Sequence, residues 1–335
     1  MAKSNVLALV GSESLIGREI RDLLSGNPLG EKLKLIAAGE DEVGKLTHQG
    51  GEAAIVAALE TQNLGPAGII FLAGPPESTR RAMEVAPDAR LIDLTGANDD
   101  SPRARLRAPM VELAGYSVPA DSIHVIPNAA AIAIALVMGR LHDAHKIKRA
   151  VAHIFEPASE RGAAGVEELQ AQTIGLLSFK GQPKEIFDAQ LAFNLLAGYG
   201  EEAPMALADA EVRVERHLAT LLSMSSQAPM PSLRLVQAPV FHGYSVSLWI
   251  EFESNPEVSA IEKALDRPPV DVRRLENGLP DVVGMAGQEG LAVGGITPDR
   301  NQPQAAWLWI VADNLRLQAQ NALAVARELT GARAG

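Results

Sequence analysis

The first residues with chemical potential form a glycine-containing loop near the N-terminus, Gly11-Ser-Glu-Ser-Leu-Ile-Gly17. It follows an expected strand and opens an expected helix, where a loop can present backbone N–H groups and a helix N-terminus to a dinucleotide pyrophosphate. Ser14 replaces the middle glycine of the usual pattern, so the loop also fits a strand-to-helix turn that binds nothing. The candidate cofactor contacts in the loop are Gly11, Ser12, Ser14, Leu15 and Ile16.

Glu40 follows the second expected strand, where an acidic residue of a dinucleotide-binding domain accepts hydrogen bonds from the adenosine ribose. A carboxylate there repels a 2′-phosphate, so NAD is favoured over NADP if a nicotinamide cofactor binds at all. Glu40 also opens an acidic run with Asp41 and Glu42, and a solvated turn is the commoner explanation of such a run. Gly74 and Asn314 complete the candidate cofactor contacts.

The sequence contains no cysteine, which excludes disulfides, zinc–thiolate sites and a thiol nucleophile. Its net charge of −11 repels a phosphodiester backbone, so we do not expect nucleic acid as a partner. The apolar runs at residues 6–10 and 129–138 are shorter than the roughly 20 residues of a membrane-spanning helix. The N-terminus lacks a cleavable secretory pattern. We therefore expect a cytoplasmic protein without membrane contacts, and we predict no metal site.

The elements that must position these residues alternate in the first third of the chain. Hydrophobic periodicity predicts strands at residues 5–10, 33–38, 68–73 and 90–94, and helices at 15–24 and 77–85. Such alternation implies βαβ crossovers and a parallel, doubly wound sheet that binds nucleotides at strand carboxyl ends. We predict an α/β fold with a Rossmann-like dinucleotide-binding domain at residues 1–128.

A second domain is expected at residues 129–313, because 335 residues exceed one ordinary core. A helical run at 129–141 precedes β-rich segments at 147–155, 233–241, 244–252 and 305–311. These long strands indicate an α+β domain with a mostly antiparallel sheet covered by helices on one side. An amphipathic C-terminal helix, within residues 314–335, is expected to pack back on the first domain.

Seven segments together resemble the aspartate-semialdehyde dehydrogenase family in order and spacing. The resemblance covers nearly the whole chain and implies a Rossmann NADP domain, a dimerising catalytic domain and a role in amino-acid biosynthesis. The segments are the Gly11 loop, Leu91-Ile-Asp-Leu-Thr95, Ile126-Pro-Asn128, Gly162-Ala-Ala-Gly-Val-Glu-Glu-Leu169, Ala192-Phe-Asn194, Pro239-Val-Phe-His-Gly243 before Glu251-Phe-Glu253, and Val311-Ala-Asp-Asn-Leu-Arg316 with Asn321-Ala322.

The resemblance also identifies catalytic positions, and each holds a different residue here. The family's nucleophilic cysteine, directly after the Pro-Asn pair, is replaced by Ala129, and a methyl group cannot attack an aldehyde. The family's glutamine corresponds to Glu156 and its substrate-carboxylate arginine to Gln237, whose neutral amide cannot form a charged bidentate pair. The acid/base histidine corresponds to Tyr244, and a phenol is a poor proton acceptor near neutral pH.

The phosphate-binding cations of the family are also missing. The expected arginine falls in Asn98-Asp-Asp100 and the expected lysine falls near Pro204. His242 is placed two residues before Tyr244, on the same face of a strand, and could be a substitute base. We interpret it as an ordinary strand histidine, because no nucleophile exists for it to serve.

These observations favour a catalytically inactive, Usg-type paralogue that keeps the family's homodimer and binds a nucleotide or small metabolite weakly or not at all. Two alternatives stay open. One is an enzyme with a rebuilt pocket in which Glu156, Tyr244 and His242 form a new acid/base set. The other is authentic NAD(P)-dependent semialdehyde dehydrogenase activity in amino-acid biosynthesis, against which the missing thiol argues directly.

Overall fold

The computed structural model describes residues 6–331 and divides the chain into two compact units. The N-terminal unit comprises the residues up to Pro127 together with those from Gln318 onward, and the central unit is Asn128–Leu317. The sequence placed these divisions at 128/129 and 313/314. No helix within the described residues has the length and apolar character needed to cross a bilayer.

The sheet of the N-terminal unit is parallel throughout, with strand order β2-β1-β5-β6-β8-β7. Its central strands are fully buried on both faces, which explains their uninterrupted apolar sequences. The order places β1 between β2 and β5, so the chain reverses its direction of winding next to β1. The strands are β1 (Leu7–Val10), β2 (Leu33–Ile36), β5 (Ile69–Leu72), β6 (Arg90–Asp93), β7 (Ala104–Leu106) and β8 (Ile123–Val125).

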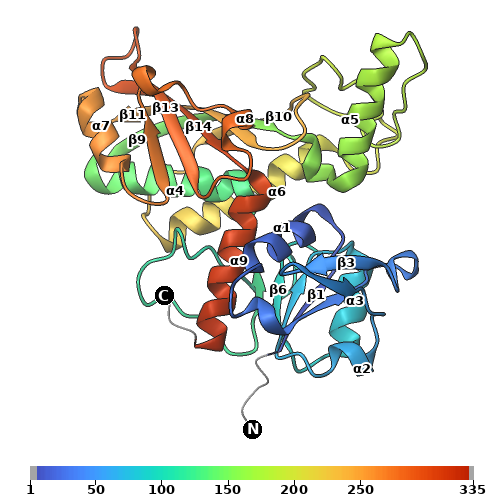
Figure 1. The fold of residues 1–335 in the computed structure, drawn as a ribbon. Helices are drawn as coiled ribbons and strands as arrows, with labels where there is room; N and C mark the ends of the chain where they lie inside the picture. Colours follow the sequence, from blue (N-terminus) through green and yellow to red (C-terminus); the bar gives the residue numbers. More distant parts are fainter. Residues whose placement is uncertain (1–5, 332–335) are drawn as a thin grey trace. The chain divides into compact units, whose positions relative to one another are not determined.

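Three helices and a hairpin complete this part of the chain (Figure 1). The helices are α1 (Leu15–Leu24), α2 (Thr61–Leu64) and α3 (Pro76–Val85), and the hairpin joins β3 (Leu46–Gln49) to β4 (Glu52–Ile55). Short 3-10 turns occupy Gly30–Lys32 and Glu40–Glu42. The expected strands and helices agree with these bounds to within two residues. The sequence pattern does not predict β7, β8 or the hairpin, because each of these strands has only three or four residues and at least one of them is polar.

The central unit is built on a mixed sheet with strand order β10-β9-β11-β14-β13-β12. The three inner pairings are antiparallel, and both edge strands run parallel to their neighbours. The sheet is therefore mostly antiparallel, as predicted. Its strands are β9 (Ile147–Glu156), β10 (Ser232–Gln237), β11 (Tyr244–Phe252), β12 (Val270–Arg273), β13 (Leu291–Pro298) and β14 (Ala305–Ala312).

Helix α4 (Ala129–Ala144) is apolar on nearly all sides and contacts β9, β11 and β14, which makes it the central helix of this unit. Helices α6 (Leu207–Met224) and α7 (Val258–Leu265) flank α4 (Figure 1). The other helices are α5 (Gly162–Leu177), preceded by a 3-10 turn at Ala158–Arg161, and α8 (Val282–Met285), preceded by one at Leu275–Asn277. These elements bury the alternate side chains of β11 from Tyr244 to Ile250.

The opposite face of this sheet carries all three tryptophans of the chain. Trp249 on β11 pairs directly with Trp307 on β14, and Trp309 lies two residues further along the same face. The indole N–H groups of Trp249 and Trp307 both donate to Asp299 Oδ2 at 2.9 Å. This face, defined here by the three tryptophans and Phe155, is the tryptophan face; each of its four rings is partly exposed.

Helix α9 (Asn314–Thr330) begins in the central unit, and its residues from Gln318 onward belong to the N-terminal unit. Within that unit, Gln318 Nε2 donates to the Pro127 carbonyl at 3.1 Å, and Arg107 forms an ion pair with Glu328. The expected strand at 233–241 ends at Gln237 instead, because residues 238–243 form a loop whose Gly243 has φ of +88°. Asn5 and residues 332–335, part of two predicted elements, lie outside the described residues.

Candidate functional site

The glycine loop lies at the carboxyl ends of β1, β2 and β5 in the N-terminal unit. Gly11 has φ of +80°, and its N–H donates to the Ile36 carbonyl at 3.0 Å. A Cβ at Gly11 would lie 2.4 Å from the backbone nitrogen of Gly74, and a Cβ at Gly74 would lie 2.8 Å from Ala38 Cβ. Three neighbouring strand ends therefore approach one another too closely for larger residues, as at the ligand crevice of a doubly wound sheet.

The N-terminus of α1 has the donors that a diphosphate needs. Ser14, which replaces the middle glycine, directs its hydroxyl to its own helix and accepts the Gly17 N–H at 3.0 Å. The N–H groups of Leu15 and Ile16 donate to no acceptor among the described residues. Ser12 is fully buried, and its hydroxyl has no hydrogen-bond partner in the described part of the chain. This loop fits the pyrophosphate of a dinucleotide.

The turn after β2 departs from the prediction in one respect. Glu40 is exposed, and its carboxylate forms no hydrogen bond or ion pair with the described residues. Glu42, two residues later, reaches back to accept the Ala38 N–H at 2.7 Å. Glu40 is therefore solvent-exposed in this turn, whereas Glu42 is a structural carboxylate that accepts a backbone N–H.

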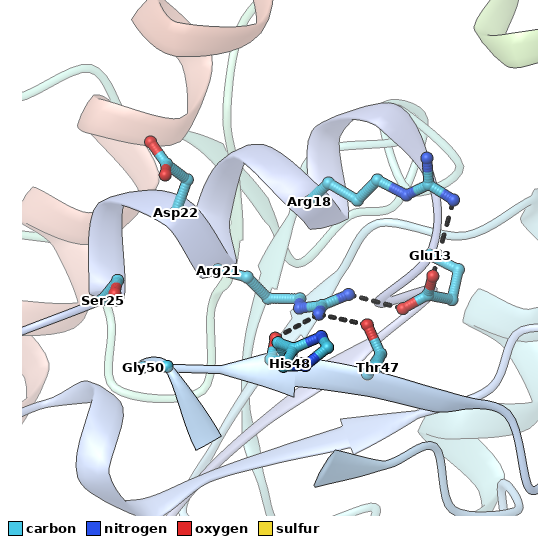
Figure 2. A pocket seen from close by; sticks show the side chains of 9 residues that line it. Glu13, Arg18, Arg21, Asp22, Ser25, Thr47, His48 and Gly50 are labelled. Carbon is cyan, nitrogen blue, oxygen red and sulfur yellow. Dashed lines mark hydrogen bonds and ion pairs between the residues drawn. The ribbon is translucent and has the colours of Figure 1, made fainter. Parts of the chain in front are cut away.

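An open pocket lies between α1 and the β3–β4 hairpin, and its volume is about 500 Å³. Figure 2 shows the side chains that line it. The Arg21 guanidinium bonds to Glu13, Thr47 Oγ1 and the His48 carbonyl, each at 2.5 Å, and Arg18 lies 3.5 Å from Glu13. Glu13 therefore pairs with both arginines, and Arg21 links the glycine loop to the hairpin. The pocket is lined by Glu13, Arg18, Arg21, Asp22, Ser25, Thr47, His48, Gly50 and Gly51.

In the central unit, the N-terminus of α4 begins at Ala129. Asn128 caps the helix by accepting the Ala130 N–H at 2.8 Å, and its own N–H donates to His217 Nδ1 at 3.0 Å. Ala129, Ala130 and Ala131 are completely buried. A reactive side chain at residue 129 would have been activated by the helix N-terminus, but the position holds a methyl group.

A chain of hydrogen bonds runs away from this helix end. Asn128 Nδ2 donates to the Tyr244 hydroxyl at 3.0 Å, and that hydroxyl donates to Glu156 Oε2 at 3.1 Å. The other oxygen of Glu156 accepts from the Arg161 guanidinium. Burial, and next the nearby Glu156 carboxylate, raise the pKa of the Tyr244 phenol well above its usual value. Burial opposes the charge of Arg161, but Glu156 raises its pKa above the ordinary range.

Glu160 is the second carboxylate of this cluster. Burial and the charge of Glu156 raise the pKa of Glu160. Its oxygens accept from Asn314 Nδ2 at 2.8 Å and Asn128 Nδ2 at 3.3 Å, while Asn314 Oδ1 accepts the Gly243 N–H at 2.9 Å. Both Nδ2 and Oδ1 of Asn314 therefore form hydrogen bonds inside the central unit. The sequence predicts Asn314 as a cofactor contact.

Gln237 is also fully engaged. Its Nε2 donates to the Glu156 carbonyl at 2.8 Å, and its Oε1 accepts from the Tyr199 hydroxyl. The Arg161 guanidinium lies 5.9 Å from the centre of the Tyr199 ring. The cation next to Tyr199 therefore comes from the turn after β9, and it is paired with Glu156.

His242 does not share a strand face with Tyr244, contrary to expectation. Strand β11 begins at Tyr244, and the left-handed conformation of Gly243 breaks the alternation before it. His242 Nδ1 is buried without a partner among the described residues, and burial lowers the pKa of the ring. The structure joins Glu156 to Tyr244 but leaves His242 out of their hydrogen-bonded chain.

The sequence model of the semialdehyde dehydrogenase dimerisation domain matches residues 138–317, more than half of the chain. The chain belongs to the semialdehyde dehydrogenase family. Among its relatives, the aspartate-semialdehyde dehydrogenase of Rickettsia bellii is 26% identical, with 98% of each chain covered. The USG-1 protein homolog of Pseudomonas aeruginosa is 29% identical, covering 92% of this chain and 93% of that protein. These matches confirm the resemblance inferred from the motifs.

A solved structure shares the fold of this chain over nearly its whole length. The probable aspartate-semialdehyde dehydrogenase from Pseudomonas aeruginosa has a TM-score of 0.84 and 27% identity, covering 97% of this chain and 98% of its own. The prediction of an α/β fold with a Rossmann-like domain and a dimerisation domain is therefore confirmed.

The sequence did not identify Arg161 and Glu160, the two residues that complete the hydrogen-bonded cluster around Glu156 and Tyr244. Arg161 and Glu160 lie between Ser159 and the α5 motif, and two adjacent opposite charges in a largely apolar stretch were the available signal. Asn98, at an expected phosphate cation position, is buried and donates to Asp93 Oδ2 at 2.8 Å. Pro204, at the other position, offers no charge to a phosphate.

Proposed function

We propose that this chain is a catalytically inactive member of the aspartate-semialdehyde dehydrogenase family that forms a homodimer and retains a nucleotide site at its glycine loop. In the family reaction a cysteine thiolate attacks the aldehyde carbon, hydride passes to a nicotinamide cofactor, and phosphate releases the acyl group. Ala129 lacks the electron pair for the first of these steps, so no covalent intermediate can form at this position.

One observation carries the proposal: the groups around Ala129 hydrogen-bond to one another. Tyr244 donates to Glu156, and Glu156 is paired with Arg161. A substrate carboxylate that took the place of Glu156 on Arg161 would leave Glu156 as a buried charge without its partner, which costs about 3 to 5 kcal/mol. Burial raises the pKa of Tyr244, so the phenol is a weaker acid than usual and stays protonated near neutral pH, where it cannot accept a proton.

The direct test is an assay of the purified protein with aspartate semialdehyde, inorganic phosphate and either NAD or NADP. We expect no phosphate-dependent formation of reduced cofactor above the rate of a blank without protein. A cysteine-containing aspartate-semialdehyde dehydrogenase, assayed in parallel, verifies the substrate. Phosphate-dependent turnover by this chain would overturn the proposal.

The nucleotide site is proposed for a dinucleotide pyrophosphate at the glycine loop. The free N–H groups of Leu15 and Ile16 and the unpartnered hydroxyl of Ser12 support it. A nicotinamide cofactor would supply hydride-transfer chemistry, but Ala129 provides no thiohemiacetal to deliver the hydride. The site is therefore assigned to binding alone.

The homodimer is proposed from the dimerisation domain and from the composition of the tryptophan face. Trp249, Trp307 and Trp309 lie together on one sheet face, and Arg149 lies 5.7 Å from the Trp249 ring centre. Tryptophan and arginine are the residues most enriched at the energetic centres of protein interfaces. A sheet face of this composition fits an isologous contact with a second copy of the chain.

A further inference from the structure

We propose that the Glu42 carboxylate selects the nucleotide, admitting an adenosine ribose with free 2′- and 3′-hydroxyls and rejecting one that carries a 2′-phosphate. This inference rests on the proposed nucleotide site. It moves the selection from Glu40, where the sequence placed it, to a residue two positions further along the same turn.

The first step is the position of the Ala38 backbone. Ala38 follows β2, whose last residue Ile36 accepts the N–H of Gly11 in the glycine loop. Ala38 Cβ would also meet a Cβ placed at Gly74, at 2.8 Å. The backbone of Ala38 therefore lies beside the glycine loop, at the strand end where a doubly wound domain receives the adenosine ribose.

The second step concerns the group that accepts the hydrogen bond of the Ala38 N–H. A backbone N–H at the end of a strand is a donor for an anion or a hydroxyl of a ligand. Here the Glu42 carboxylate accepts it at 2.7 Å, a distance typical of a charge-assisted hydrogen bond. An internal anion already occupies the donor that a ribose phosphate would need.

The third step is the charge of the turn. Asp41 Oδ1 packs so close to Gly39 that a Cβ there would lie 2.6 Å away, and Glu40 is exposed beside it. Lys45 lies 3.7 Å from Asp41, an exposed pair that neutralises one of the three carboxylates. A 2′-phosphate carries nearly two negative charges and would be repelled, whereas a hydroxyl can donate to the free lone pairs of Glu42.

The experiment is calorimetric titration of NAD and NADP into the full-length protein and into three variants: Glu42→Gln, Glu40→Gln and Asp41→Asn. Glutamine keeps an acceptor oxygen for the Ala38 N–H and removes the charge, so the turn should fold as before. We expect the wild type to prefer NAD. Glu42→Gln should improve NADP binding relative to NAD by about tenfold, as for the loss of one charge near a phosphate. Asp41→Asn, the matched control, should change this ratio less.

The outcomes separate the two proposals. If the wild type binds NAD and Glu42→Gln leaves the ratio unchanged, or if Glu40→Gln changes it more, the role of Glu42 is overturned while the nucleotide site stands. If the wild type binds neither cofactor but Glu42→Gln binds NADP, the exclusion of the 2′-phosphate by Glu42 is supported, whereas the admission of the unphosphorylated ribose is overturned. If no variant binds either cofactor, both proposals are overturned. A circular dichroism melt of each variant excludes unfolding as the cause.

Discussion

At the scale of single residues, the loss of the thiol at residue 129 is accompanied by changed hydrogen bonding around it. Glu156 satisfies Arg161, Tyr244 satisfies Glu156, and Asn128 satisfies Tyr244. These four side chains therefore bond to one another rather than face a substrate. The cluster is therefore a set of mutually dependent residues, and a change at residue 129 alone leaves these hydrogen bonds in place.

We therefore expect Ala129→Cys to stay inactive with aspartate semialdehyde, phosphate and NADP. The new thiol at the N-terminus of α4 should have a lowered pKa, but no side chain is placed to transfer protons during the reaction. Alkylation by iodoacetamide across a pH series would show whether the thiolate forms, and the turnover assay would show whether it acts. Recovery of turnover to near that of an authentic family enzyme would contradict this account of Glu156, Gln237 and Tyr244.

At the scale of elements, β7, β8 and α9 of the N-terminal unit meet at a buried charged cluster. Arg107 pairs with Glu112 at 2.9 Å and with Glu328 of α9, and its guanidinium lies 3.4 Å from His124 Nδ1 on β8. Burial first, and then the charges of Arg107 and Arg90, lower the pKa of His124 to about 4. A neutral histidine is thus part of the contact among these elements.

This histidine predicts a specific dependence of stability on pH. In the unfolded chain His124 is protonated near its reference pKa of about 6.5. In the folded protein His124 becomes protonated only when the pH approaches 4. The free energy of unfolding should therefore fall as the pH falls through this window, by about 3 kcal/mol, and should be unaffected by His124 above it. Urea unfolding of His124→Asn should show a flatter dependence between these limits than the wild type.

The matched control is His48→Asn, which makes the same change at an exposed histidine of the same unit. Its pH dependence should parallel that of the wild type, since both proteins keep His124. Equal slopes for His124→Asn and the wild type would refute the contribution of His124.

At the scale of the whole molecule, the proposed homodimer makes the tryptophan face an interface. Light scattering at micromolar concentration should give twice the chain mass of 35.4 kDa. The double variant Trp249→Ala and Trp307→Ala should dissociate the dimer at least tenfold more readily, because truncating a buried tryptophan at an interface centre costs about 2 kcal/mol or more. Leu46→Ser, at an exposed apolar residue of the N-terminal unit, is the control and should stay dimeric.

A monomeric wild type at micromolar concentration would contradict the homodimer. A dimer that is unaffected by the double variant would place the interface elsewhere on the central unit. Trp249 and Trp307 share the Asp299 carboxylate, so single variants would each leave one indole bond in place.

The sequence by itself determined the fold class, the family and the absence of a thiol. Strand and helix periods are local properties, and the identity of residue 129 needs no coordinates. The resemblance to the family's motifs therefore identified Ala129, Glu156, Gln237 and Tyr244 as its catalytic positions. The hairpin and the short strands β7 and β8 could not be identified, because each has a polar residue among its three or four positions, whereas the equally short β1 and β5 are uninterrupted apolar runs.

Only the tertiary structure decided which groups meet. Arg161 reaches Glu156 across a turn, Tyr199 reaches Gln237 across 38 residues, and Glu42 rather than Glu40 turns back to Ala38. The strand face predicted for His242 failed because the positive φ of Gly243 breaks the strand, and glycine adopts either sign of φ without a signal in its neighbours. Hydrogen-bond partners depend on side-chain direction in the folded chain, which spacing along a sequence does not fix.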